Sequence, residues 1–470
     1  MPTMPEFSVS QVPEVVASTF QVAGLWWLPS APRNAVGGLL RLGDREGSLE
    51  VAGQLVDHEE RTPQCLLGRS TAGESFTIPV ANLTSTGGAA GGQPNGVEVH
   101  SQRFSCYSVL RGAHFDGGDS QRYEVVTFTS PDLAQWINGR HGTYREVSET
   151  ERAIEFKVPE PLQISLPSGR LSLVWDEKVS YGLDVVAHVD PTFAWEPTVP
   201  ILLSEAESLI QQPLEFFLTL AAGEPIKLDR VRVGNAGPRG YPILATIMSP
   251  PRFGFPHAPD LRPWEYLIPF DRVEADLPTV LGRWIELCSA HRSALLQYFV
   301  GALSPHTFLE EMFLSTVRAA EIWHRGAGGG TAMAPSDFDA LIATVRDAVN
   351  DDHWSFLRDR LVHANEPSLK TRLDAMIVAA GDPLSSLLQS FPRFTRRVVD
   401  TRNRFTHHGT QDDRPFSDVE LFYAQKACAM LFGMTLLSEV GLREVVAEHL
   451  TRTSEWGWLT GDNPLVSRTT

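Results

Sequence analysis

The pattern of apolar residues changes near residue 275, and this change restricts the chain to folds that join a β-rich part to a helical part. Before that position, short alternating or β-branched runs such as SLEVAGQLV and YEVVTFTS are separated by Gly, Pro and Asp, as in antiparallel strands. After it, stretches such as FLEEMFLSTVRAAEIWHR carry apolar residues at three- and four-residue spacing, which predicts helices. We therefore predict an α+β multidomain protein in which an antiparallel, β-rich, sandwich-like N-terminal domain precedes an all-α helical bundle.

A chain of 470 residues exceeds a single ordinary core, so two or three domains are expected. We place the β-rich domain at residues 1–275, a connecting helix at 276–305 and the helical domain at 306–470. The segment PTFAWEPTVP interrupts the strand pattern near residues 190–200, so a subdivision of the β-rich domain there stays open.

Cysteine usage and apolar runs limit the setting in which the chain works. The four cysteines are widely spaced and form no CxxC pair, which argues against a zinc ribbon and a disulfide framework and favours a reducing, cytoplasmic setting. The sequence does not begin with a basic segment followed by an apolar one, and no apolar run approaches the roughly 20 residues that cross a bilayer. We therefore expect neither secretion nor membrane insertion.

The net charge of -17 is unevenly distributed along the chain. Residues 306–470 hold 17 Lys and Arg against 22 Asp and Glu, so most of the excess negative charge belongs to the preceding part. Residues 393–404, in contrast, contain five arginines and one aspartate. Since the local field decides where an anion binds, this segment is a candidate anion-binding patch.

The segment FPRFTRRVVDTRNRFTHHGT, residues 391–410, places Arg402, Asn403 and His407 within six positions. A guanidinium that is always charged, an amide and an imidazole that titrates near neutral pH provide the chemistry to hold and cut a phosphodiester. These three residues are the predicted catalytic groups.

A helix over residues 392–408 would divide this segment into two faces, because each residue turns about 100° around the axis. Phe394, Val398 and Phe405 fall on one stripe, which we expect to anchor the helix. The nearly opposite stripe, which we expect to be free, contains Arg396, Asp400, Asn403 and His407.

The spacing between the arginine and the histidine is not distinctive on its own. The chain repeats it at Arg252 and His257, Arg318 and His324, Arg358 and His363, and Arg443 and His449. Only the copy at residues 402–407 adds the asparagine, the surrounding arginines and a helix with two distinct faces.

This copy resembles the motif of HEPN ribonucleases, in which a polar residue follows the arginine and a histidine lies four to six residues after it. The whole chain also resembles the ApeA family of antiviral proteins, in which a β-rich N-terminal domain precedes a HEPN domain. The residues that carry this second resemblance are GLWWLP (24–29), GGLLRL with SLEVAGQL, and the helix FLEEMFLSTVRAAEIWHR (308–325), which would open the HEPN bundle.

The resemblance implies that two HEPN domains pair across a twofold axis, in a homodimer or a higher even oligomer, with both copies of Arg402 and His407 in one cleft. It implies an endoribonuclease of abortive-infection defence against phage that needs neither a metal nor another cofactor. The ribose 2'-hydroxyl would attack the adjacent phosphate, so DNA would be spared. RNA is the expected substrate, with tRNA as one candidate, and a phage-encoded trigger or an inhibitory partner would control the activity.

In this interpretation His407 would move a proton, Arg402 would neutralise charge on the phosphoryl oxygens, and Asn403 would orient the imidazole or the phosphate. The RNA backbone would be bound by Arg396, Arg397, Arg404 and His408.

Two further residues qualify this assignment. His408 also has a permitted spacing from Arg402, so which histidine acts stays open, although the helical phase favours His407. Glu321 lies on the helix expected to open the bundle, and the family often places an acidic residue opposite the motif. We leave Glu321 outside the predicted site.

Other interpretations stay open. The segment can be the end of a structural helix with a solvated basic face, where His407 and His408 neighbour the last carbonyls before Gly409. The protein can also be a catalytically silent RNA- or ligand-binding module that dimerises through its helical domain. A metal site that adds His353 or His363 to the motif histidines is not predicted, because adjacent histidines on a helix point about 100° apart and no further ligand completes a site.

Overall fold

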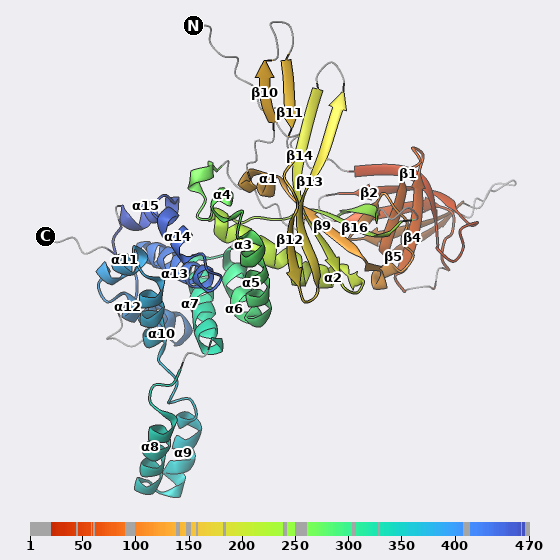
Figure 1. Cartoon of the computed structure of the whole chain (residues 1–470). Coiled ribbons are helices and arrows are strands. Elements are labelled where there is room, and N and C mark those ends of the chain that lie inside the picture. Colours follow the sequence, from red (N-terminus) through yellow and green to blue (C-terminus); the bar gives the residue numbers. More distant parts are fainter. Residues whose placement is uncertain are drawn as a thin grey trace.

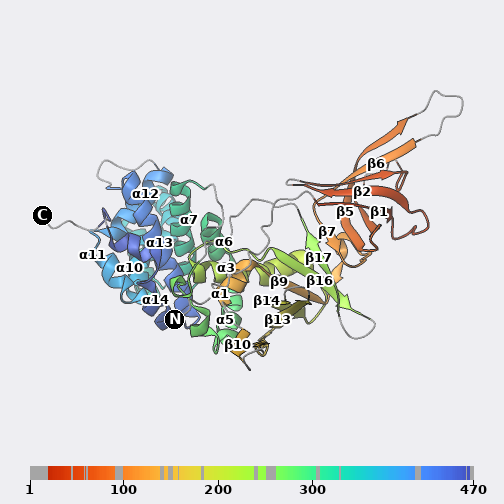
Figure 2. The same ribbon diagram turned by 90° about the horizontal axis from the view of Figure 1, so that it is seen from above.

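The computed structural model describes residues 20–465 with interruptions. The interruptions fall at residues 44–45, 58, 60–61, 90–98, 138–141, 147–151, 157, 182–184, 238–241, 250–260, 303–306, 328–329, 408–413 and 462. Figures 1 and 2 show an elongated molecule with a β-structure at one end, helices at the other and an open sheet between them.

The N-terminal strands close into a barrel. The sheet order β5-β4-β1-β2-β3-β6 returns on itself because β6 also pairs with β5. The barrel strands are β1 (Phe20–Trp27), β2 (Val36–Leu42), β3 (Gly47–Ala52), β4 (Gln64–Ser70), β5 (Ser75–Ala89) and β6 (Val99–Cys106). Closure removes the exposed sheet edges that an open sheet of this size would leave.

Trp26 fills the barrel interior and is fully buried. Its indole lies over Gly68 on the neighbouring strand, where an added Cβ would come 2.3 Å from the ring, so this position requires glycine. The Phe76 ring lies 6.2 Å from the indole, and Phe104 is also fully buried. The barrel therefore has an apolar core of its own.

An open antiparallel sheet continues from the barrel through the short strand β7 (Val109–Arg111), which pairs with β5 on one side and β17 on the other. Its further strands, in sheet order, are β17 (Pro242–Met248), β16 (Arg230–Ala236), β9 (Val125–Thr129), β14 (Val185–Pro197), β13 (Gly169–Tyr181) and β12 (Leu162–Leu166). The described pairings are all antiparallel, which confirms the predicted fold class. The β-rich part is a barrel joined to an open sheet.

Helices cover the end of the open sheet. Gly282 of α5 (Leu277–Ala290) faces β12, where an added Cβ would make an ordinary contact of 3.8 Å with the Ile164 side chain. The buried Trp284 indole donates a hydrogen bond of 2.7 Å to the carbonyl of Pro213 in α3 (Gln212–Ala222). The segment predicted as one connecting helix forms two, α5 and α6 (Arg292–Ala302).

The C-terminal bundle is arranged around α13 (Asp418–Glu439), most of whose apolar residues are buried. The other helices of the bundle are α7 (Leu309–Gly326), α10 (Leu369–Ala380), α11 (Leu384–Ser390), α12 (Phe394–His407), α14 (Arg443–Leu450) and α15 (Ser454–Thr460). Within the described residues, α13 is the one helix long and apolar enough to cross a membrane, but 61% of its most apolar stretch is buried inside the fold. That burial is typical of a core helix.

The open sheet and the helical bundle share one apolar core. Phe216 of α3 stacks on Phe299 of α6 with 4.0 Å between ring centroids, and Tyr298 meets Phe432 of α13 at 5.0 Å. Gly433 permits the close approach of Leu220 from α3, because an added Cβ would lie 3.3 Å from that side chain. The boundaries predicted at residues 275 and 305 therefore follow the change in secondary structure, and they stay a prediction.

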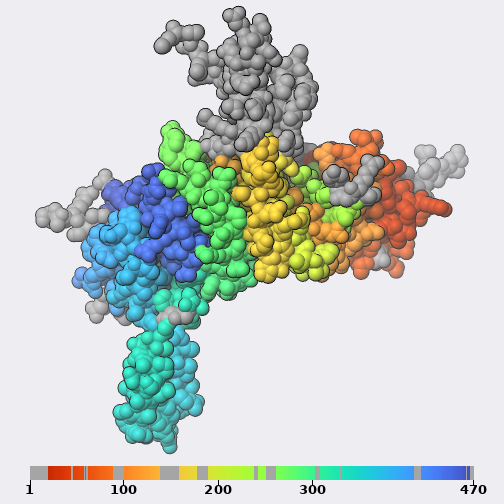
Figure 3. All heavy atoms as spheres, in the orientation of Figure 1, coloured from red at the N-terminus to blue at the C-terminus, as the bar shows by residue number. Residues whose placement is uncertain are grey.

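A helical hairpin projects from the bundle (Figures 1 and 3). It consists of α8 (Pro335–Ala348) and α9 (Asp351–Leu361), and we call residues 335–361 the arm. At the base of the arm, two hydrogen bonds between Asn365 and Met333, of 2.9 and 3.1 Å, join the segment that enters the arm to the segment that leaves it. No residue from 330 to 371 is buried, so the arm stands clear of the shared core.

Candidate functional site

The motif helix α12 is held by one buried face. Phe394, Val398 and Thr401 are almost completely buried, and the Thr401 hydroxyl accepts a 2.9 Å hydrogen bond from the backbone of Phe416. The predicted anchor Phe405 is 38% exposed. It lies near the end of the helix and meets one ring, that of Phe313 in α7, at 6.4 Å.

Asp400 departs from the predicted division of the helix into two faces. It was expected on the free stripe, but it is buried. Its Oδ1 lies 2.9 Å from Arg396 Nε one turn earlier, in an ion pair. The same oxygen has no aligned hydrogen bond among the described residues. Asp400 is therefore engaged by Arg396, and the expectation that it lies on an open face was wrong.

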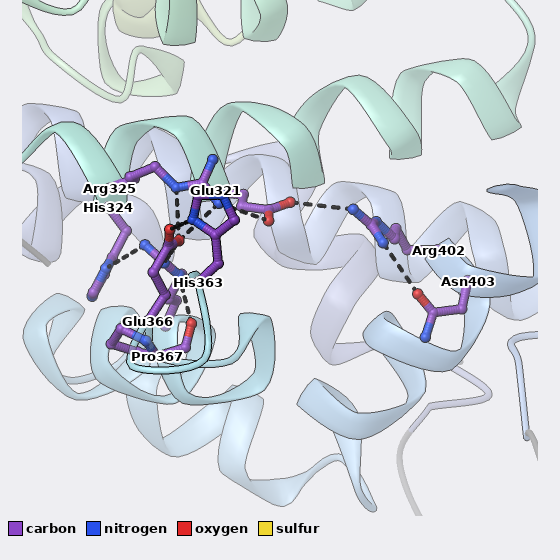
Figure 4. Close-up of polar contacts among 9 residues, drawn as sticks. Glu321, His324, Arg325, His363, Glu366, Pro367, Arg402 and Asn403 are labelled. Carbon is purple, nitrogen blue, oxygen red and sulfur yellow. Dashed lines mark hydrogen bonds and ion pairs between the residues drawn. The ribbon is translucent and has the colours of Figure 1, made fainter. Parts of the chain in front are cut away.

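Arg402 and Asn403 lie together, as Figure 4 shows. Arg402 Nη1 donates a 3.2 Å hydrogen bond to Asn403 Oδ1, and Arg402 Nη2 lies 3.4 Å from Glu321 Oε2 on α7. The Arg402 side chain is 28% exposed, and its buried Nε has no hydrogen-bond partner within the described part of the chain. Both terminal nitrogens of the guanidinium thus have partners inside the protein, while the side chain stays partly accessible to solvent.

His407 is the last residue of α12. It follows Asn403 by four residues, which places its Cα on the same side of the helix one turn later. Its side chain and the whole of His408 lie outside the described residues.

Glu321, which we did not include in the predicted site, is in contact with it. It lies between two arginines, because its Oε1 is 3.7 Å from Arg325 Nη2 while its Oε2 faces Arg402. Arg325 also pairs with Glu366 at the base of the arm, at 3.0 Å. The one signal in the sequence was the position of Glu321 on the helix expected to face the motif.

Glu366 contacts several side chains where the arm meets the bundle (Figure 4). Its carboxylate lies 3.1 Å from Arg372 Nη2 and 2.9 Å from His363 Nδ1. Desolvation alone would raise the pKa of Glu366, but the hydrogen bond to His363 and the charge of Arg325 outweigh it and hold the pKa below its usual value. The carboxylate therefore stays charged and fixes the arm to the bundle.

Arg372 is itself buried and contacts the bundle on two sides. Its Nε donates to the carbonyl of Pro367 at 2.9 Å, and its Nη1 lies 3.4 Å from His324 Nδ1. Burial and the neighbouring Arg372 charge both lower the pKa of His324. His324, which shares the motif's spacing with Arg318, thus serves a structural contact.

Arg397 and Arg404 occupy contrasting positions on α12. The Arg397 guanidinium lies 4.4 Å from the Phe416 ring centroid and 2.8 Å from the Glu420 carboxylate, which also caps α13 by accepting from Ser417. Arg397 therefore ties α12 to the start of α13. Arg404 is exposed and forms no side-chain hydrogen bond or ion pair with the other described residues.

His, Cys, Asp and Glu supply the side chains that most often bind metal ions in proteins. No three of these side chains come together to hold an ion in the described ranges. His353 lies near the tip of the arm in α9, and His363 contacts Glu366.

The fold and site together define a class: a β-rich domain joined to a helical bundle that presents an arginine and a polar neighbour near the end of one helix. Family models match both halves, ApeA N-terminal domain 1 over residues 21–284 and Apea-like HEPN over residues 314–445. The chain therefore belongs to the ApeA-like proteins with a C-terminal HEPN domain. HEPN domains are generally ribonucleases, and this family points to antiviral defence. Neither the curated proteins nor the solved structures gave a match.

Proposed function

We propose that the protein is a metal-independent endoribonuclease of abortive-infection defence against phage. The observation that carries this proposal is the arrangement of Arg402, whose guanidinium is oriented by Asn403 and Glu321 and remains partly accessible. An oriented guanidinium can stabilise charge as it develops on a phosphoryl group, without the cost of reorganising at the moment of reaction.

In the proposed reaction, the ribose 2'-hydroxyl loses its proton and its oxygen attacks the adjacent phosphorus. The bond from phosphorus to the 5'-oxygen breaks, and that oxygen takes up a proton, so the products are a 2',3'-cyclic phosphate and a 5'-hydroxyl. His407 transfers one of these protons, which can contribute roughly 10²- to 10⁴-fold. Arg402 stabilises the phosphoryl oxygens, and Asn403 orients the phosphate or the imidazole.

RNA would follow the basic side of α12. Arg396 pairs with Asp400 but its side chain stays 53% exposed, Arg404 is exposed, and His408 follows the helix. These residues are the proposed contacts to the RNA backbone. Arg397 was predicted as a fourth contact, but its guanidinium is engaged with Glu420 and Phe416. Its contribution to RNA binding is therefore the least of the four.

The proposed active unit is a homodimer of HEPN domains in the cytoplasm. HEPN domains typically bind RNA as dimers, and a second copy would add another Arg402 and His407 to the cleft. A phage-encoded trigger or an inhibitory partner would control cutting, since an unrestrained ribonuclease harms its own cell. Structured RNA such as tRNA is the proposed substrate.

The ion pair between Arg402 and Glu321 also supports a second candidate, a catalytically silent RNA- or ligand-binding module dimerised through the helical domain. The carboxylate already neutralises part of the guanidinium charge. In that case RNA would bind without being cut.

The test compares wild type with Arg402→Ala and His407→Ala on total cellular RNA in excess EDTA. Arg318→Ala serves as a matched control, because Arg318 has the same spacing to a histidine but lies on α7. We expect fragments with cyclic phosphate ends from wild type and the control alone. Cleavage that persists in both motif variants, or that stops with EDTA, would overturn the proposal. Bound but intact RNA, with infected-cell extract present, would favour the silent module.

A further inference from the structure

The arm has no core of its own. None of its residues is buried. From the half-buried residues we infer a seam between its two helices, formed by Ile342 and Val345 of α8 and Trp354 and Leu357 of α9. Short helices gain most of their stability from tertiary packing of an apolar face. A hairpin that buries so little is therefore expected to pack against something further.

Two large apolar side chains lie exposed near the middle of the arm. Leu341 is 45% exposed and Phe356 is 59% exposed. Each directly precedes a seam residue, Ile342 or Leu357, so each is turned about 100° from the seam. Because α8 and α9 run antiparallel, the same turn brings both side chains to one face of the hairpin. That face carries a small apolar patch at mid-height.

On α9, opposite charges flank Phe356. Asp352 precedes Phe356 by four residues and Arg360 follows it by four, so all three share one side of α9. The Arg360 guanidinium lies over the Phe356 ring, 3.7 Å from its centroid, and its Nη1 donates a 2.9 Å hydrogen bond to the Phe356 carbonyl. Within the described residues, neither Asp352 nor Arg360 forms an ion pair. The pattern is negative, apolar, positive along one helix.

Such a pattern is complementary to itself when reversed. Consider a second copy of α9 that runs antiparallel to the first, related to it by a twofold axis at the level of Phe356. Asp352 of each copy would then face Arg360 of the other, and the apolar patches would be in contact. A twofold interface of this kind uses the same patch on both copies. The parallel arrangement would instead place like charges together, which is destabilising.

We propose that the arm is an interface between two copies of this chain, which pair end for end through Leu341 and Phe356 and through reciprocal ion pairs of Asp352 with Arg360. The helix α8 spans about 21 Å at 1.5 Å per residue, so the two bundles lie at opposite ends of the paired arms. This contact is thus separate from any pairing of the two motif helices. It doubles the mass of the protein, whether the HEPN domains are monomeric or already paired.

The test measures the mass of the full chain by sedimentation velocity over a range of concentrations. We expect Arg360→Glu and Asp352→Arg each to halve the mass of the assembly, because each variant sets like charges against one another. In an equimolar mixture, Asp352 of one variant faces Arg360 of the other, and the introduced glutamate faces the introduced arginine. Both ion pairs can therefore form, one with its native sign and one reversed, and we expect the mixture to recover the wild-type mass.

Arg358→Glu is the matched control. Arg358 lies about 200° around α9 from Arg360, and its recorded partner is Asp359 in its own chain, so this variant should keep the wild-type mass. Helicity measured by circular dichroism verifies that each variant is folded. The proposal is overturned if the single variants keep the wild-type mass, or if the mixture fails to regain it. Loss of phage protection in Arg360→Glu without a change in mass would show that the arm binds a different partner.

The outcome does not depend on catalysis. A ribonuclease assay on Arg360→Glu reports on the proposed function, and sedimentation reports on the arm. If the HEPN domains do not pair, the arm contact still turns monomers into dimers, so the two proposals fail separately.

Discussion

Arg402 Nη2 on α12 lies 3.4 Å from Glu321 Oε2 on α7, and this ion pair joins residues 81 positions apart in the chain. Both side chains are about a quarter exposed, so solvent partly screens the attraction. The distance is longer than that of a strong charge-assisted hydrogen bond. The carboxylate therefore orients the guanidinium without a strong bond, and the accessible part of the Arg402 side chain can still contact RNA.

Glu321→Gln should slow RNA cleavage. The amide keeps a neutral hydrogen-bond acceptor but loses the charge, which weakens the contact by about 1 kcal/mol and lowers the cleavage rate constant roughly fivefold. Single-turnover cleavage at saturating protein would measure this change. Glu311→Gln, on the exposed side of α7, is the control. Faster cleavage by Glu321→Gln would show instead that Glu321 competes with RNA for Arg402.

Arg397→Ala and Arg404→Ala should separate stability from RNA binding. Loss of the Arg397 contacts to Glu420 and Phe416 should lower the free energy of unfolding by about 2 kcal/mol, measured by urea denaturation. Arg404→Ala should leave it within about 0.5 kcal/mol. The Arg404 variant should instead bind RNA more weakly, with a shallower dependence on salt. Equal stability of the two variants would contradict the role given to Arg397.

His449 should make the protein sensitive to mild acid. It is buried, and neither ring nitrogen has a hydrogen-bond partner among the described residues. Burial, followed by the charge of Arg452, lowers the pKa of His449. In mild acid the unfolded chain therefore binds more protons at His449 than the folded chain does. The contribution of the neutral, buried His449 to the free energy of unfolding is complete above the ordinary pKa of about 6.5 and is lost as the pH falls below it.

Thermal unfolding between pH 7 and pH 5 tests this expectation. His449→Leu should lose less stability over that range than wild type does. His353→Leu, at an exposed position on the arm, should follow wild type. An identical pH dependence in all three proteins would exclude His449 as the cause.

Phe216→Ala should destabilise the helical bundle although Phe216 belongs to the part of the chain that matches the N-terminal domain. The Phe216 ring stacks on Phe299 in the shared core, and truncating a buried phenylalanine costs about 3–5 kcal/mol. Amide hydrogen exchange in α13 should become faster. Phe76→Ala, in the separate barrel core, should leave α13 protected. Protection of α13 in both variants would mean that the two halves unfold independently.

The strand and helix patterns were enough to predict the order of the two parts, because the period of the apolar residues differs between them. Closure of the barrel was not predictable, since it depends on pairing between β5 and β6 in addition to the local pattern of each strand. The projection of the arm from the bundle was not predictable either. Its half-buried residues, such as Ile342 and Leu357, have the same spacing along the sequence as the buried residues of a core helix.

Within the site, residue chemistry identified Arg402 and Asn403, which the structure brings together. The Glu321 contact depends on how α7 packs beside α12, which no spacing within one helix can specify. The ideal helix also misplaced Phe405, because a residue near a helix end is buried only where neighbouring elements reach it. The boundary residues and the working histidine stay predictions.

The three-residue strand β7 has a mechanical consequence. Through it the barrel and the open sheet form one hydrogen-bonded surface, and the far end of that surface shares its interior with the helices. The barrel is therefore joined to the rest of the protein by sheet hydrogen bonds. A molecule that binds the barrel would load strands that lead without a break to the core beneath the helices.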